Sequence, residues 1–336
     1  MPAPGLNRFV QQHWQRVTWL TLLLAPLAAI FGLVVRLRRR AYAVGALPGQ
    51  RLPVPVVVAG NISVGGTGKT PLALWLVEAL RERGMAAGIV SRGYRGGGLP
   101  MQVHPHSDPA RAGDEPVMLA TRARCPVFVG KDRAAAARAL LSRHPGVEVI
   151  VCDDGLQHYR LLRDLEIAVI DAGAGFGNGW LLPAGPLREP PARLDRVDAV
   201  VVNGGTRTGL RAPVFSMRLE GTVARNLRVP GLETPLASLS GTQLHAVAGI
   251  GNPQRYFGHL RDAGLSFTAH AFPDHHPFTA ADLDFGDDHP VLMTEKDAIK
   301  CRGFARSNWW MLPVSARIEP DLATFIIERL FPARGR

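Results

Sequence analysis

The chain has 336 residues, 46% of them hydrophobic and 20% charged, which excludes a disordered protein and allows more than one compact domain. Its formal net charge of +11 favours acidic partners such as nucleic acid, anionic lipid or phosphorylated substrates. Nucleic acid is the least favoured, because no Lys/Arg-rich tract interleaved with aromatic residues stands out in the body of the chain. The three cysteines are scattered and lack metal-ligand spacing, as is typical of reduced thiols in a cytosolic compartment.

An uncharged run over residues 17–35 is the first predicted element. A helix over this run spans about 28 Å, close to the thickness of a bilayer core. Trp14 and Trp19 lie near its start, and arginines follow its end at positions 36, 38, 39 and 40. These arginines argue against a cleaved signal peptide, whereas Pro26 keeps a buried amphipathic helix open as an alternative. The pattern favours a membrane anchor over residues 1–40, with the rest of the chain in the cytoplasm. Whether the helix crosses the bilayer or lies in its interface stays open.

A glycine-rich loop at residues 63–70 is the most informative stretch. It follows an apolar run at 54–59 and precedes a helical pattern at 71–80, so the order is strand, loop and helix. Such a loop turns its backbone amides toward a phosphate, its lysine reaches the β- and γ-phosphates, and its threonine ligates Mg²⁺. ATP and Mg²⁺ are therefore the expected cofactors, and a plain helix-capping turn is disfavoured. The predicted nucleotide-binding residues are Ser63, which replaces the usual first glycine, Val64, Gly65, Gly66, Thr67, Gly68, Lys69 and Thr70.

Two carboxylates, Asp153 and Asp154, end a second apolar run at 147–152. An acidic residue at the end of such a strand holds Mg²⁺ or its waters in phosphate-loop enzymes, although an isolated Asp pair is more often a turn or a helix cap. Another strand follows at 165–171. The proline-rich segment at 181–190 then carries Arg188, either in a surface linker or beside a transferring phosphate.

Eight short motifs occur in order along the chain: GNISVGGTGKTP at 60–71, SRGY at 91–94, GDEP at 113–116, DDGLQH at 153–158, LPAGPLRE at 182–189, GIGNP at 249–253, DHH at 274–276 and TEKD at 294–297. Together they resemble the tetraacyldisaccharide 4′-kinase family, the lipid A kinases of Gram-negative envelopes. The resemblance implies transfer of the γ-phosphate of ATP to the 4′-hydroxyl of a tetraacylated glucosamine disaccharide 1-phosphate. The expected partners are this lipid A disaccharide precursor and inner-membrane lipid, at the cytoplasmic face of the bacterial inner membrane. No nucleic acid and no obligate protein partner are expected.

The resemblance also implies roles for single residues. Asp114 matches the base that accepts the proton of the acceptor hydroxyl, and His275 matches a histidine that supports it. Lys69 and Arg188 would meet the charge of the transferring phosphoryl group. The residues matching the acidic set around Mg²⁺, together with Thr70, are Glu115, Asp153 and Asp154. Without the resemblance, Asp114 would be interpreted as part of a surface turn and His275 as part of a solvated loop.

The predicted fold class is α/β, with a P-loop NTPase-like parallel sheet flanked by helices over residues 41–212. A hairpin linker is expected at 213–230, followed by a second, smaller α/β domain over 231–336. Two lobes joined by a narrow linker can close around ATP and acceptor and exclude water. The segment 96–111, rich in Gly, Pro and His, is expected to be a flap near the acceptor.

Two other classes of protein also combine a nucleotide-binding fold with membrane association. A membrane-associated P-loop ATPase switch of the partitioning type shares the Gly-Gly-x-Gly-Lys-Thr loop, but it carries a signature lysine where this chain has Val64. Its membrane helix is also usually C-terminal. A membrane adaptor with an inactive nucleotide fold is disfavoured because the candidate catalytic residues are all present. The number and length of the acyl chains and the oligomeric state stay open.

Overall fold

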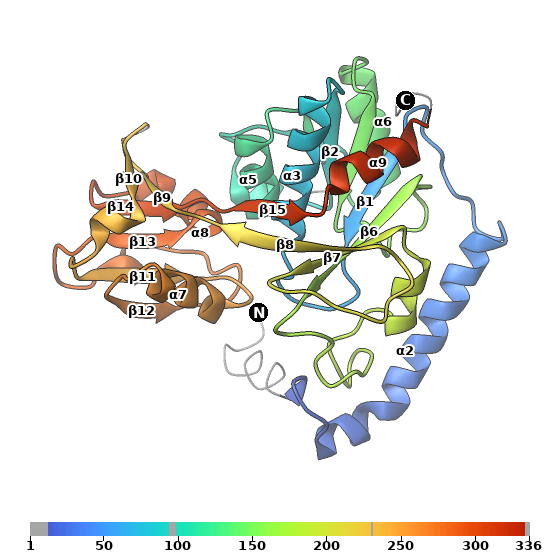
Figure 1. Cartoon of the computed structure of the whole chain (residues 1–336), viewed down its shortest axis with the longest axis horizontal. Coiled ribbons are helices and arrows are strands. Elements are labelled where there is room, and N and C mark those ends of the chain that lie inside the picture. Colours follow the sequence, from blue (N-terminus) through green and yellow to red (C-terminus); the bar gives the residue numbers. More distant parts are fainter. Residues whose placement is uncertain (1–12, 94–98, 230, 333–336) are drawn as a thin grey trace.

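The computed structural model describes residues 13–93, 99–229 and 231–332, and within these residues the strands form two sheets. One sheet has nine strands in the order β15-β8-β7-β6-β1-β5-β2-β4-β3, and the other has six in the order β10-β9-β14-β13-β11-β12. Each sheet is the centre of one lobe, and the two lobes lie side by side in Figure 1. The α/β class predicted from the sequence is confirmed.

The nine-stranded sheet is parallel except at its edges, where β3 and β15 run antiparallel to their neighbours. Its central strands β1 and β7 are buried over their whole length because helices cover both faces, which explains their continuous apolar sequences. Helices α3, α5 and α9 pack on one face and α6 on the other. The strands are β1 (Val56–Gly60), β2 (Ala87–Ser91), β3 (Met101–Val103), β4 (Val127–Val129), β5 (Val149–Asp153), β6 (Leu165–Asp171), β7 (Ala199–Asn203), β8 (Val214–Glu220) and β15 (Ser315–Glu319). The helices are α3 (Lys69–Glu82), α4 (Pro109–Ala112), α5 (Asp114–Arg122), α6 (Arg133–Arg143), α9 (Leu322–Leu330) and the 3₁₀ helix η1 (Pro191–Arg196).

The second lobe has a parallel core of β12, β11, β13 and β14, to which β9 and β10 add antiparallel strands. Apolar residues of α7 pack on one face of this sheet and those of α8 on the other. The strands are β9 (Val223–Asn226), β10 (Glu233–Pro235), β11 (Leu244–Ala248), β12 (Phe267–Ala271), β13 (Val291–Thr294) and β14 (Trp309–Leu312). The helices are α7 (Pro253–Asp262), α8 (Glu295–Cys301) and the 3₁₀ helices η2 (Leu236–Leu239), η3 (Ala281–Leu283) and η4 (Arg302–Phe304).

The connection between the lobes differs from the hairpin predicted at 213–230. β8 and β9 do not pair with each other; β8 lies between β7 and β15, whereas β9 pairs with β10 and β14. The chain passes from one sheet to the other at Gly221, where a Cβ atom would lie 2.8 Å from the carbonyl oxygen of Pro313. In Figure 1, β8 runs toward the second lobe and β15 runs back beside it in the opposite direction, so two paired strands connect the lobes.

The C-terminal segment also departs from the predicted boundaries, which assigned 231–336 to the smaller domain. β15 extends the nine-stranded sheet, and α9 buries Leu322 and Ile326 in the same apolar cluster as Leu76 of α3. Local pattern does not determine which lobe this segment joins, because that choice depends on these distant partners. Residues 96–98 of the expected flap lie outside the described residues, and the part that follows includes β3 and most of α4.

Helix α2 (Trp19–Ala43) includes the apolar run and continues through the arginines. The hydroxyl group of Thr18 caps its first turn. Thr21, Ala28 and Gly32 are buried, whereas leucines such as Leu23 are exposed, so one stripe faces the protein and the rest does not. By length and composition α2 could cross a membrane. In Figure 1 it lies along the side of the first lobe.

In both sheets the sequence motifs lie at the carboxyl ends of the parallel strands. The phosphate loop follows β1 and the two aspartates end β5, while the motifs at 249–253, 274–276 and 294–297 follow or end β11, β12 and β13. Functional groups of parallel sheets gather at the carboxyl ends of the strands. The candidate site therefore lies between the lobes and takes residues from both.

Candidate active site

The glycine-rich loop lies between β1 and α3, as predicted, and its conformation depends on two glycines. Gly65 and Gly68 have φ angles of 115° and 98°, a region that side chains disfavour. Gly68 is also the N-cap of α3, so Lys69 begins the helix and the positive end of the helix dipole points into the loop. Asn61 donates from Nδ2 to the hydroxyl of Thr67 at 3.2 Å. The loop is thus built to receive an anion.

Lys69 and Arg188 converge on Asp154. The Lys69 Nζ lies 3.6 Å from Asp154 Oδ1, and Arg188 Nη1 donates to the two Asp154 oxygens at 3.1 and 3.3 Å. Burial acts to raise the pKa of Asp154, but Lys69 and Arg188 outweigh it and lower the pKa. Asp154 holds a left-handed backbone conformation with φ 50°, which is unusual for a residue other than glycine. The two predicted phosphate-binding cations are therefore brought together by a charged aspartate.

Asp153 is the buried partner of this pair. Its Oδ1 has no hydrogen-bond partner among the described residues, and burial, followed by the charges of Glu115 and Asp154, raises its pKa to about 7. An unpartnered buried carboxylate oxygen beside the phosphate loop fits a cation. No group of three His, Cys, Asp or Glu residues in the described ranges could hold a metal by itself. Mg²⁺ commonly uses one or two carboxylates, waters and substrate phosphates instead, so Asp153 with the Thr70 hydroxyl fits such a site.

Asp114 and His275 meet across the boundary between the lobes. Asp114 opens α5 in the first lobe, and His275 follows β12 in the second; His275 Nδ1 lies 3.0 and 3.1 Å from the two Asp114 oxygens. Burial acts to raise the pKa of Asp114, but the hydrogen bond from His275 and the charge of Lys296 lower it to about 2. The same hydrogen bond raises the pKa of His275. Asp114 is therefore buried at a contact between the lobes rather than in a surface turn, whereas His275 lies in a loop, 38% exposed, and is held by Asp114.

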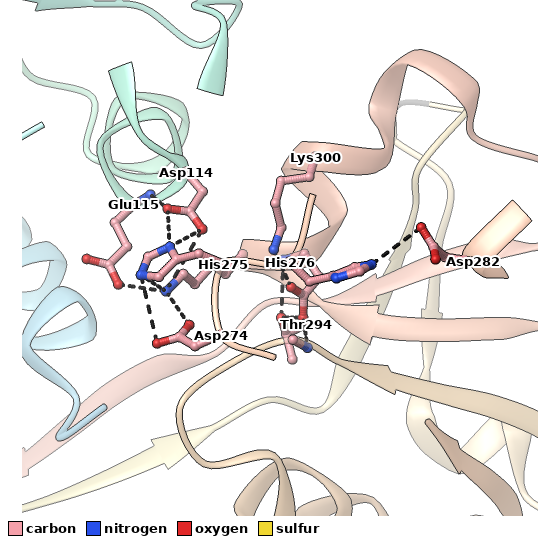
Figure 2. Close-up of polar contacts among 11 residues, drawn as sticks. Asp114, Glu115, Asp274, His275, His276, Asp282, Thr294 and Lys300 are labelled. Atoms are coloured by element: carbon pink, nitrogen blue, oxygen red, sulfur yellow. Dashed lines mark hydrogen bonds and ion pairs between the residues drawn. The ribbon is translucent and has the colours of Figure 1, made fainter. Parts of the chain in front are cut away.

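Lys296, on the first turn of α8, is a residue to which the sequence analysis gave no role. Its Nζ lies 2.9 Å from Glu115 Oε1, 3.1 Å from Asp274 Oδ1 and 3.9 Å from Asp114 Oδ2. Burial acts to lower its pKa, but Glu115 and Asp274 raise the pKa above its ordinary value. Figure 2 shows Asp114, Glu115 and Asp274 gathered around His275, with Lys300 and the His276–Asp282 pair further away. The only sequence signal for Lys296 was its place in the TEKD motif.

Glu115 and Glu189 differ in their contacts. Glu115 contacts Lys296, although it is close enough to Asp153 to raise the pKa of that residue. Glu189 is fully buried and accepts hydrogen bonds from Gln157 Nε2 at 2.8 Å and from the Tyr159 hydroxyl at 2.6 Å. Glu189 therefore holds the segment that carries Arg188 through Gln157, which also accepts from Arg188 Nη1 at 3.4 Å. Tyr94, the last residue of the SRGY motif, lies outside the described residues.

Comparisons with known proteins agree over nearly the whole chain. A family model described as tetraacyldisaccharide-1-P 4′-kinase matches residues 20–331. A tetraacyldisaccharide 4′-kinase of Aromatoleum aromaticum is 51% identical, covering 98% of this chain and 99% of the relative, and one of Methylobacillus flagellatus is 49% identical, covering 97% of each. The crystal structure of LpxK from Aquifex aeolicus in complex with ATP has a TM-score of 0.79 and 29% identity, over 93% of this chain and all of that one.

Proposed function

This chain belongs to the tetraacyldisaccharide-1-P 4′-kinase family, and from that premise we propose how its own residues perform the transfer. It is an ATP-dependent kinase of lipid A biosynthesis, which phosphorylates the 4′-hydroxyl of a tetraacylated disaccharide 1-phosphate. The alternative of a partitioning-type ATPase switch is not favoured, because the relatives carry the kinase name over 97–99% of their length.

Asp114 is the base, and the observation that carries this assignment is its hydrogen bond to His275 across the two lobes. Because its pKa is about 2, Asp114 is charged at neutral pH and always able to accept a proton. His275 Nδ1 lies between the two Asp114 oxygens and holds the carboxylate in one orientation, in which a remaining lone pair can accept the proton of the acceptor hydroxyl. The hydroxyl loses its proton late in a loose phosphoryl transfer, so a weak, well-positioned base is sufficient.

Lys69 and Arg188 bind the oxygens of the transferring phosphoryl group and neutralise their charge, with Asp154 holding both cations in place beforehand. Thr70 and Asp153 would hold Mg²⁺, and Asp154 and Glu115 are the further carboxylates proposed around it. The metal supplies neutralisation of the β- and γ-phosphate charge when bound.

The proposed location is the cytoplasmic face of the inner membrane, with α2 in the bilayer interface rather than across it. A Cβ at Gly32 would lie 2.7 Å from Leu181 Cδ1, and Asn178 Nδ2 lies 3.4 Å from the Thr21 hydroxyl, so α2 packs against the first lobe at both positions. A helix packed along a polar lobe cannot also be surrounded by lipid. Its outward leucines would enter one leaflet, and its last arginines would meet anionic headgroups.

Substitution of the base tests the assignment. Asp114→Asn keeps the size of the side chain but removes its basicity, so kcat should fall about 10²–10⁴-fold with little change in ATP affinity. His275→Ala should cost less, and the double variant should be hardly worse than Asp114→Asn alone, because the two residues act as a unit. The measurement is the gain of one phosphate by a disaccharide lipid, followed by mass spectrometry. A harmless Asp114→Asn would refute the assignment and move the base to another carboxylate.

A further inference from the structure

Arg255, on the first turn of α7, reaches from the second lobe into the first, although the proposed chemistry does not use it. Its Nη1 donates to Asp171 Oδ2 at 2.5 Å, and its Nη2 donates to Asn203 Oδ1 at 2.6 Å. A planar guanidinium makes two such bonds with a fixed geometry that a lysine cannot reproduce. The contact is therefore specific in orientation as well as charge.

The two residues that accept hydrogen bonds from Arg255 are held rigidly by the first lobe. Asp171 and Asn203 are the last residues of β6 and β7, stand opposite each other in the sheet, and are 6% and 1% exposed. The other oxygen of Asp171 is already held by the backbone N–H groups of Gly173 and Ala174, at 3.0 and 2.9 Å. Arg255 thus docks on groups that the first lobe holds in place.

Asn203 continues the connection to the phosphate loop. Its Nδ2 donates to the carbonyl oxygen of Thr67 at 3.0 Å while its Oδ1 accepts from Arg255, so the amide is held in one orientation from both sides. A Cβ at Gly68 would lie 2.6 Å from the same nitrogen, which shows how closely the loop approaches. Nearby, a Cβ at Gly251 would lie 3.3 Å from the backbone nitrogen of Gly66. The second lobe therefore touches the loop directly and also through Asn203.

We propose that Arg255 is a positioning residue that couples closure of the second lobe to the shape of the phosphate loop. With the lobes closed, Arg255 orients Asn203, and Asn203 holds the carbonyl of Thr67 so that the amides of the loop face the triphosphate. Coupling of this kind is reciprocal, so ATP in the loop favours the closed lobes as much as closed lobes favour ATP. The inference rests on the proposed role of residues 63–70 in binding ATP, and it is independent of the identity of the base.

The test is hydrogen exchange of the full-length protein with and without Mg·ATP, in the absence of a lipid acceptor. In the wild type, ATP should slow exchange both in 63–70 and in 249–256. In Arg255→Met, ATP should still slow exchange in 63–70, but most of the ATP-dependent slowing in 249–256 should disappear, and kcat/KM for ATP should fall about 10- to 100-fold. Arg255→Lys should recover only part of both effects. Arg261→Met is the matched control, because Arg261 lies on the same helix and packs over the Phe267 ring of its own lobe.

Arg255→Met leaves the buried carboxylate of Asp171 without its cation, which could disturb the fold by itself. The double variant Arg255→Met/Asp171→Asn removes this unpaired charge and is therefore measured as well. Loss of the ATP-dependent slowing in 249–256 in that double variant supports the coupling. The inference is overturned if ATP protects 63–70 in the wild type while 249–256 responds equally in wild type and variants. A wild type whose residues 63–70 do not respond to ATP at all would instead overturn the nucleotide-loop assignment, and the inference with it.

Discussion

Lys296→Met should weaken the closed arrangement of the two lobes. Methionine keeps most of the volume of the lysine side chain, so the change removes the charge rather than the packing. The ammonium group contacts Asp274 within its own lobe, but its contacts with Glu115 at 2.9 Å and Asp114 at 3.9 Å cross between the lobes. Without Lys296, the negative charges of these three carboxylates would be less neutralised, and their mutual repulsion would favour separation of the two lobes.

The burial of the Lys296–Glu115 pair places the free energy lost on removing it between two known limits. Breaking a buried ion pair costs about 3–5 kcal/mol, whereas an exposed pair contributes about 0–1 kcal/mol. The side chain of Lys296 is 13% exposed and that of Glu115 is 40% exposed, so the pair lies between these limits. A loss of about 2 kcal/mol corresponds to a shift of about 30-fold in the closure equilibrium. We therefore expect kcat/KM for the lipid acceptor to fall by up to about 30-fold.

The assay is phosphorylation of detergent-dispersed disaccharide lipid at saturating Mg·ATP, with thermal melting measured on the same samples. Lys300→Met is the matched control, because Lys300 lies one turn further along α8, is similarly buried, and pairs at 2.8 Å with Asp297 of its own lobe. Lys296→Arg should restore part of the activity. If Lys296→Met and Lys300→Met lower kcat/KM equally, the contact between the lobes is not what Lys296 contributes.

Three further predictions concern the nucleotide, the metal and the membrane. Lys69→Ala should abolish most turnover while the circular dichroism spectrum stays unchanged, because Lys69 is the residue of the loop expected to reach the β- and γ-phosphates. Near-full activity of this variant would exclude the phosphate-loop assignment. Since burial raises the pKa of Asp153 to about 7, this group is about half protonated at pH 7, and a bound cation favours its charged form. Binding of Mg²⁺ near pH 7 should therefore release a proton, seen by calorimetry as a heat that depends on the buffer, and Asp153→Asn should remove that dependence; an unchanged dependence would contradict the assignment. Deleting residues 1–40 should move the protein toward the soluble fraction and lower activity on bilayer lipid more than on detergent-dispersed lipid, whereas an unchanged membrane fraction would place the main anchor elsewhere.

The sequence was most informative where function follows from a continuous stretch of chain. The phosphate loop needs a strand, glycines and a helix in immediate succession, and the structure has them in that order between β1 and α3. The carboxylates Asp153 and Asp154 follow by the same logic, because parallel strands end at one edge of a sheet. Both features depend on local pattern alone.

Features that join distant segments were not predictable in this way. The alternation of β15 indicates a strand but does not identify β8, about 100 residues earlier, as its partner. Asp114 and His275 were paired only through the family resemblance, since 161 residues separate them and each alone is typical of a loop. Lys296 and Arg255 carry no local sign of function either. Their roles follow from contacts that exist only once both lobes are folded.

The contacts between the lobes suggest a physical reason why phosphate would be transferred to the acceptor rather than to water. His275, Lys296 and Arg255 come from the chain that follows β12, β13 and β11, three parallel neighbours of one sheet. Because these three strands pair within one sheet, a rigid-body displacement of that sheet would make or break the contact with Asp114, the ion pair with Glu115 and the contact with Asn203 together. With the proposed roles of these residues, an open enzyme would lack the oriented base and the held phosphate loop at the same time. We expect that closing the lobes on the acceptor would complete the site and remove water in one step, which would make the acceptor hydroxyl the favoured nucleophile.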